Sequence, residues 1–169
     1  LIERERVRRR TGLQLLAAES VATPAVRAAM GSVLADKYAE GYPGRRFRGG
    51  CEVVDEVEEL ARERARNLFG AEYANVQPLS WVLANLAVLA AFAQPGDPLL
   101  SLSLQHGGHQ SHGSRANSSG RWFTVTNYGV RPDTEQVDYD RIAELAMIHR
   151  PRILIAGGTA YTRTWDMAR

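Results

Sequence analysis

The sequence DYDRIAELAMIHRPRILIAGG, residues 138–158, contains a helix pattern that leads directly into a strand pattern. In residues 138–150 apolar side chains recur at helical spacing, and Asp138 stands where a helix N-cap belongs. Residues 152–158 contain an apolar run, which predicts a strand. Because helices usually join the strands of a parallel sheet, this stretch favours an α/β domain with a mainly parallel sheet.

The same alternation extends toward the N-terminus. We expect strands at residues 99–104 and 121–129, and a short strand at residues 71–78 that ends at Pro78. Residues 81–93 read as a helix that is apolar on nearly every side, which predicts that it is buried. Ligands of such sheets bind outside the carboxyl ends of the strands. The loops that we expect to carry function therefore follow strands: residues 78–81, 105–114 and 157–163.

Composition narrows the class of protein. The chain has 169 residues, enough for one domain with its own core. A formal charge of +2 gives no electrostatic basis for nucleic-acid binding. The one cysteine, Cys51, excludes an internal disulfide, and no apolar run is long enough to span a membrane, so we expect a cytoplasmic protein. The chain begins at Leu1 and ends in a helix-like segment, so we expect it to be a piece of a longer protein.

Two helix patterns flank a glycine-rich connector, residues 37–51. Before it, Thr23 and Pro24 form a good N-cap and first-turn pair. After it, residues 52–69 carry apolar side chains at helical spacing, and Gly70 stands where a C-cap belongs. The connector also contains acidic, basic and aromatic side chains that a simple loop does not need, which indicates a functional role.

Three histidines recur at every third residue of the loop at residues 105–114: His106, His109 and His112. Three interpretations stay open: a metal site, loop histidines that hydrogen-bond the backbone, and a flat imidazole that stacks on a planar cofactor. A zinc site would need a further ligand or a defined open position, and no CxxC or HExxH pattern accompanies the loop, so we do not expect a metal ion. Spacing alone does not choose among the three.

Four segments together resemble one known family in their order and separation. They are KYAEGYPGRRFRGGCE (37–52), LFGAEYANVQP (68–78), HGGHQSHGS (106–114) and RILIAGGTAYTRTWDMAR (152–169). In these segments the chain closely resembles serine hydroxymethyltransferase, and the resemblance runs from residue 13 to the last residue. The signature KYAEGYPG is specific, far more so than a lone glycine pattern.

The resemblance implies the fold type I of pyridoxal-phosphate-dependent transferases, which is like that of aspartate aminotransferase. Residues 1–36 would form an N-terminal arm, and residues 37–51 would connect the two subunits of a homodimer. Residues 52–169 would form the first, incomplete part of the αβα-sandwich large domain that binds the cofactor. The rest of the active site would come from residues beyond this chain or from a complementing chain.

The resemblance also implies an activity, the interconversion of serine and glycine with transfer of a one-carbon unit to tetrahydrofolate. Its cofactor would be pyridoxal 5′-phosphate. Glu40 would be the acid/base carboxylate close to the substrate hydroxyl and the folate, and Tyr38 would reach the cofactor phosphate of the neighbouring subunit. His109, a further catalytic residue, would stack on the pyridine ring. Thr159 takes the place of a serine whose hydroxyl serves the ring's phenolic oxygen.

Other positions are expected to contact the substrates. The segment that lines the folate pocket in the family corresponds here to Leu104, Gly108, His109 and Gln110. Glu19 lies beside Ala18, which stands where the family has a carboxylate-binding serine. Arg48 replaces a tyrosine near the substrate carboxylate, and arginine can bind a carboxylate through its bidentate fork.

The phosphate-binding loop departs from the family pattern. Ser80 is retained, but Trp81 replaces a glycine and Val82 replaces a serine. The lysine that holds the cofactor covalently would lie beyond residue 169, since Lys37, the one lysine here, belongs to the connector. Two alternatives therefore stay open: another aldol or transaldol reaction of the same cofactor on a β-hydroxy amino acid, and a non-catalytic remnant.

Overall fold

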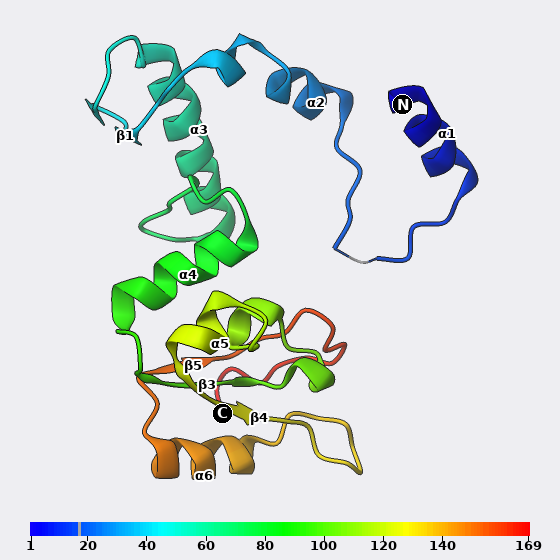
Figure 1. The fold of residues 1–169 in the computed structure, drawn as a ribbon, viewed down its shortest axis with the longest axis vertical. Helices are drawn as coiled ribbons and strands as arrows, with labels where there is room; N and C mark the ends of the chain where they lie inside the picture. The colour runs from blue at the N-terminus through cyan, green and yellow to red at the C-terminus, as the bar shows by residue number, and fades with distance from the viewer. Residues whose placement is uncertain (17) are drawn as a thin grey trace. The chain divides into compact units, whose positions relative to one another are not determined.

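The computed structural model describes residues 1–16 and 18–169, and it divides into two compact units (Figure 1). The first unit is Leu1–Val76 and the second is Gln77–Arg169.

The first unit consists of helices and one small hairpin. Thr23 caps the second helix, because its hydroxyl oxygen accepts a hydrogen bond from the Val26 N–H at 3.3 Å, as the sequence predicts. Gly70 ends the third helix in the left-handed conformation, also as predicted. The elements are α1 (Ile2–Thr11), α2 (Pro24–Met30), the short 3₁₀ helix η1 (Val33–Asp36), the hairpin strands β1 (Gly41–Tyr42) and β2 (Arg45–Arg46), and α3 (Glu52–Phe69).

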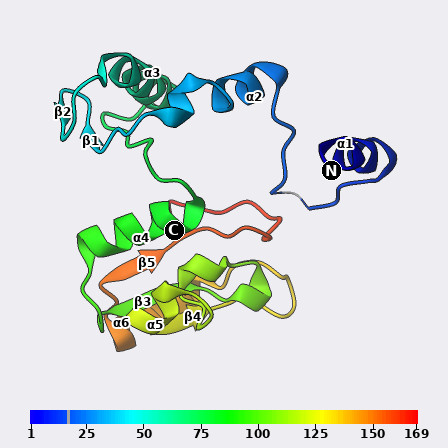
Figure 2. The same ribbon diagram turned by 45° about the horizontal axis from the view of Figure 1, so that its top comes forward.

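The second unit is a parallel sheet with helices. Its strands are β3 (Pro98–Leu102), β4 (Thr124–Tyr128) and β5 (Ile153–Ile155). Its helices are α4 (Trp81–Phe92), α5 (Ser118–Trp122) and α6 (Tyr139–His149), with the 3₁₀ turns η2 (Leu104–His106) and η3 (Gln110–His112). Strand β3 lies between β4 and β5 and pairs with both in parallel (Figure 2). The α/β class and the parallel sheet predicted from the sequence are confirmed.

Each face of the sheet packs against its own helices (Figure 1). On one face, Leu100 and Tyr128 form a buried cluster with Leu145 of α6. On the other face, Leu99 is buried together with Leu89 of α4. Because successive strand residues point to opposite faces, the neighbouring leucines of β3 anchor both layers. The sheet and its helices therefore form a layered arrangement.

Three predicted strand boundaries were wrong. The strand predicted at residues 152–158 spans only Ile153–Ile155. The other two differ for local hydrogen-bonding reasons. Residues 118–122 form helix α5, because the Asn117 side chain caps it by accepting the Ser119 N–H, and β4 begins only at Thr124. Strand β3 ends at Leu102, because Ser103 starts a 3₁₀ turn. Short polar residues favour such caps over a continued strand.

The strand predicted at residues 71–78 is absent; that segment is irregular. No strand in the described part of the chain pairs with it, and Tyr73 is exposed, so the backbone has no ladder to join. The helix predicted at residues 81–93 is present, but its burial was overestimated. Leu89 is buried, whereas other apolar side chains of α4, among them Val88 and Phe92, are exposed, because the helix presents one side to the sheet.

No helix in residues 1–16 and 18–169 is both long enough and apolar enough to pass through a lipid bilayer.

Replacing Leu100 with alanine should destabilise the protein by about 2–5 kcal/mol, because the side chain is fully buried and its removal leaves a cavity. The control is Leu154→Ala on the neighbouring strand, directly opposite Leu100 in the register but 43% exposed. Urea denaturation of both variants measures the difference. Equal losses of unfolding free energy would contradict the placement of Leu100 in the core.

Candidate functional site

Two of the loops predicted to carry function meet at the carboxyl ends of β3 and β5. The N–H groups of Thr159 and Ala160 both donate to the Gly107 carbonyl, at 2.8 Å and 3.0 Å. Gly107 has a φ of +99°, and a Cβ atom there would lie 2.5 Å from the Tyr161 backbone nitrogen. The loop therefore needs glycine at this position, both for its conformation and for the close approach.

Gly108 brings the same loop against the end of β3. Its N–H donates to the Ser103 carbonyl at 2.9 Å, and it is buried. A Cβ atom at this position would lie 2.2 Å from the Leu102 carbonyl oxygen, which no side chain tolerates. This close packing fixes the backbone directly before His109.

The His109 ring is held by a chain of hydrogen bonds that begins on α4. The Asn85 amide donates to the Ser111 hydroxyl oxygen at 2.6 Å, and that hydroxyl lies 2.7 Å from His109 Nδ1. The Ser111 N–H also donates to Nδ1, at 3.2 Å. Since Nδ1 accepts, the tautomer that fits carries its proton on Nε2. The imidazole is thus held in one orientation.

His112 lies beside His109, with their ring centres 5.6 Å apart in an edge-on arrangement. Burial lowers the pKa of His112, and the neighbouring His109 lowers it further. Its Nδ1 atom is buried and has no hydrogen-bond partner among the residues that the structure describes. The folded chain therefore favours the neutral form of this side chain.

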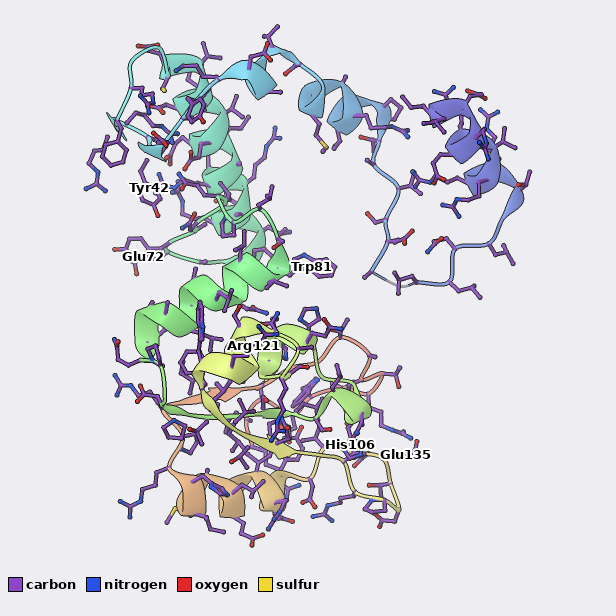
Figure 3. The ribbon with its side chains drawn as sticks, viewed as in Figure 1. Tyr42, Glu72, Trp81, His106, Arg121 and Glu135 are labelled. Atoms are coloured by element: carbon purple, nitrogen blue, oxygen red, sulfur yellow. The ribbon has the colours of Figure 1, made fainter. Side chains whose placement is uncertain are left out.

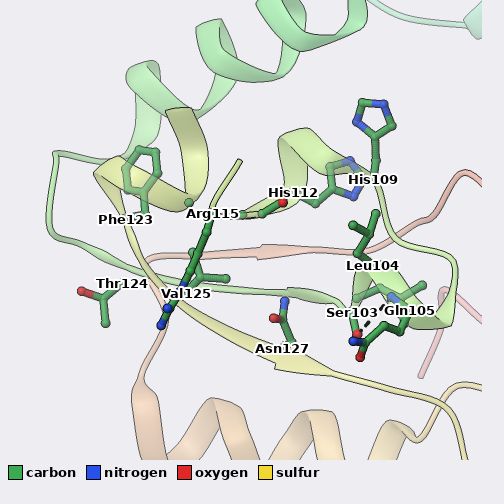
Figure 4. A pocket seen from close by; sticks show the side chains of 14 residues that line it. Ser103, Leu104, Gln105, His109, His112, Arg115, Phe123, Thr124, Val125 and Asn127 are labelled. Atoms are coloured by element: carbon green, nitrogen blue, oxygen red, sulfur yellow. Dashed lines mark hydrogen bonds between the residues drawn. The ribbon is translucent and has the colours of Figure 1, made fainter. Parts of the chain in front are cut away.

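A cavity of about 560 Å³ opens beside these rings (Figure 4). Of the predicted site residues, Leu104 and His109 line it. His112, Asn127, Gln105 and Arg115 add polar groups to its wall. Three other predicted residues of this unit do not line the cavity. Gly108 is buried within its loop, and Gln110 and Thr159 are exposed.

The N-terminus of α4 is where the sequence predicts the phosphate loop. The Ser80 hydroxyl oxygen accepts the Leu83 N–H at 3.3 Å, so Ser80 serves as the N-cap. In an α-helix the first N–H groups have no intrahelical partner, which leaves those of Trp81 and Val82 for another acceptor. The Trp81 side chain is 60% exposed and extends outward from the N-terminal end of the helix (Figure 3).

The connector assembles three predicted residues in the first unit. The Arg48 guanidinium lies 5.5 Å from the centre of the Tyr38 ring and 3.3 Å from Glu40 Oε2. All three side chains are largely exposed. Glu19 lies elsewhere along the chain, in the exposed segment between α1 and α2.

The histidines do not share one role. His106 Nδ1 accepts the Val130 N–H at 3.2 Å, which is the backbone-bonding role that the sequence left open. Within residues 1–16 and 18–169, no group of three or more histidine, cysteine, aspartate or glutamate side chains is arranged to hold a metal ion.

Sequence reasoning missed Asn85 and Ser111, which orient His109. A signal for Asn85 was present, because it is the one polar residue in an otherwise apolar helix and a half-buried amide needs a partner. Ser111 had no such signal, since serines are common in loops. It is completely buried, which only the structure reveals.

Lowering the pH from 7.5 to 5.5 should lower the melting temperature, in part through His112. Its folded pKa is lowered, so the unfolded chain takes up a proton below the ordinary value of 6.5 while the folded chain resists it. The stability is present above that value and is lost as the pH falls toward the folded pKa.

Calorimetric melting curves of His112→Asn should therefore show a smaller acid-side decrease than those of the parent protein. The matched control is His149→Asn, because His149 is exposed at the end of α6. A pH dependence that is unchanged in His112→Asn would contradict the burial of a neutral His112.

Comparison with known proteins shows to which family the chain belongs. The model of the family described as serine hydroxymethyltransferase matches residues 1–169. A protein named serine hydroxymethyltransferase from Synechococcus sp. (strain JA-3-3Ab) is 53% identical over 99% of this chain and 39% of its own length. Serine hydroxymethyltransferase 1 of Pseudomonas fluorescens (strain Pf0-1) is 54% identical over 100% of this chain and 41% of its own length. The chain thus spans about two fifths of the length of these relatives, and it belongs to the serine hydroxymethyltransferase family.

Proposed function

We propose that this chain is the N-terminal part of an enzyme that interconverts serine and glycine and transfers the one-carbon unit to tetrahydrofolate. The observation that carries the proposal is the family match over every residue of the chain, with two relatives of that name above 50% identity. The match includes both loops that meet at Gly107 and the connector that carries Glu40.

The residues present fit pyridoxal 5′-phosphate as the cofactor. Asn85 and Ser111 hold the His109 ring in one orientation, which suits stacking on a planar pyridine ring. The N-terminus of α4 offers backbone N–H groups and a favourable dipole to a phosphate. Trp81 stands at that helix end, and its side chain is 60% exposed.

When bound, the cofactor supplies an electron sink for the bond that is broken at the substrate Cα. Within this chain His109 would hold the ring by its face, and Thr159 would donate its hydroxyl to the phenolic oxygen. Ser80 and the first turn of α4 would hold the phosphate, together with Tyr38 of a neighbouring subunit. These contacts orient the cofactor without moving a proton.

Glu40 would handle the proton of the substrate hydroxyl. A carboxylate can take up a proton and return it when it lies within hydrogen-bond reach of the reacting oxygen. Arg48 beside it limits the positions of the carboxylate and supplies donors for a substrate carboxylate. Glu19 would lie at the substrate end of the site, where Ala18 leaves one hydroxyl fewer than the family has.

Folate would bind along the segment that follows β3. Leu104 is 51% exposed and lines the cavity, so it offers an apolar contact to a flat ring. Gly108 keeps the backbone close, and Gln110 presents an exposed amide. Tetrahydrofolate would thus meet the one-carbon unit at the loop that carries His109.

A second copy of the protein would cover the N-terminal arm in a homodimer, which we place in the cytoplasm. The arm exposes several apolar side chains, and an exposed apolar surface is typical of a protein–protein interface. They include Leu13, Leu15, Val21, Met30 and Val33, which are all more than half exposed. A partner subunit is the occupant that the family suggests.

The proposal predicts that the full protein containing this chain forms glycine from serine at a rate that depends on tetrahydrofolate. Glu40→Gln should lower that rate by about 10²–10⁴-fold, because it removes general acid–base catalysis. The measurement is glycine formation together with transfer of the labelled serine hydroxymethyl carbon to the folate.

Glu135→Gln is the matched control, because Glu135 is also an exposed carboxylate paired with an arginine, Arg163, and it lies outside the connector. It should leave the rate unchanged. Glycine formation that is independent of folate, or a protein that forms no glycine although it binds the cofactor, would exclude the proposed function.

A further inference from the structure

Arg46 of β2 ties the connector to helix α3. Only 5% of its side chain is exposed. Its Nε donates to Asp55 at 2.7 Å and its Nη2 donates to Glu58 at 2.6 Å. The Gly44 N–H also donates to Asp55, at 2.9 Å, and this bond and Arg46 hold the pKa of Asp55 below its usual value. One helix thus fixes both the hairpin turn and the arginine.

The remaining terminal nitrogen of Arg46 contacts the backbone on both sides of Glu40. Nη1 donates to the Ala39 carbonyl and to the Gly41 carbonyl, each at 2.7 Å. The Glu40 carbonyl between them accepts the Phe47 N–H at 3.1 Å. Three consecutive carbonyl groups are therefore held by hydrogen bonds.

These bonds determine the direction in which Glu40 points. A peptide group is planar, so a held carbonyl fixes its whole peptide plane. The carbonyls of Ala39 and Glu40 define the planes on either side of the Glu40 Cα atom. With both planes fixed, the Cα–Cβ bond of Glu40 has one direction, and only the side-chain torsions stay free. Arg46 thus acts on the carboxylate without touching it.

We propose that Arg46 is the positioning residue for Glu40. The inference rests on the proposed function, in which Glu40 handles the proton of the substrate hydroxyl. The planar guanidinium is suited to this task because its five N–H donors diverge in a fixed fork, and four bonds use it here. A lysine ammonium donates from a single point and cannot reach all four acceptors.

A double-mutant cycle in the full protein tests this. Arg46→Gln should lower kcat by about 10²-fold with little change in KM, as expected for a misplaced catalytic group. In a Glu40→Gln background the same change should lower kcat hardly at all, because the group that Arg46 positions is already gone. Arg46→Lys should give an intermediate rate.

A second readout does not depend on activity. Amide hydrogen exchange at Phe47, whose N–H bonds to Glu40, should become faster in Arg46→Gln. Arg62→Gln is the matched control, because Arg62 of α3 also pairs with a carboxylate, Glu59, and donates to a backbone carbonyl, that of Ala74. It should leave both the rate and the exchange at Phe47 unchanged.

Equal losses of kcat in both backgrounds, or unchanged exchange at Phe47, would overturn the positioning role of Arg46 but leave the proposed role of Glu40 intact. A normal rate in Glu40→Gln by itself would overturn the role of Glu40 in the proposed function, and the inference with it.

Discussion

Strand β3 is the element on which the second unit depends. It pairs in parallel with β4 and β5, so the carboxyl ends of all three strands lie at one edge of the sheet. Leu99 and Leu100 anchor its two faces in separate buried clusters. The loop after β3 then folds back against the strand through Gly108, and the loop after β5 joins it at Gly107. The place of His109 follows from this pairing.

Much of this could be predicted from patterns that act locally. The capping by Thr23 and Asp138, the end of α3 at Gly70 and the α/β alternation each depend on neighbouring residues, and the structure has them all. The errors lie where distant partners decide. The segment at residues 71–78 has strand-like residues but no neighbouring strand, and α4 is apolar all round yet has one side to bury.

The candidate site shows the same division. The resemblance to the family predicts His109 and Glu40 as site residues, and their chemistry is visible in the residue type. Asn85 carried a signal as the one polar residue of an apolar helix, whereas Ser111 and Arg46 look like ordinary loop residues in the sequence. What distinguishes them is burial and the set of acceptors that the fold brings to them. A residue that orients another side chain does so through long-range contacts, which no local sequence pattern encodes.

The two units differ in their resistance to opening, because they differ in how many side chains they bury. Among residues 1–16 and 18–76, Cys51 is the one buried residue, and its thiol faces the backbone carbonyls of Tyr38 and Arg48. Residues 77–169, in contrast, contain two buried clusters. Segments with few buried apolar contacts open at a lower cost in free energy than a core does. Transient unfolding should therefore begin in the first unit, and proteases should cleave there while the sheet is still intact.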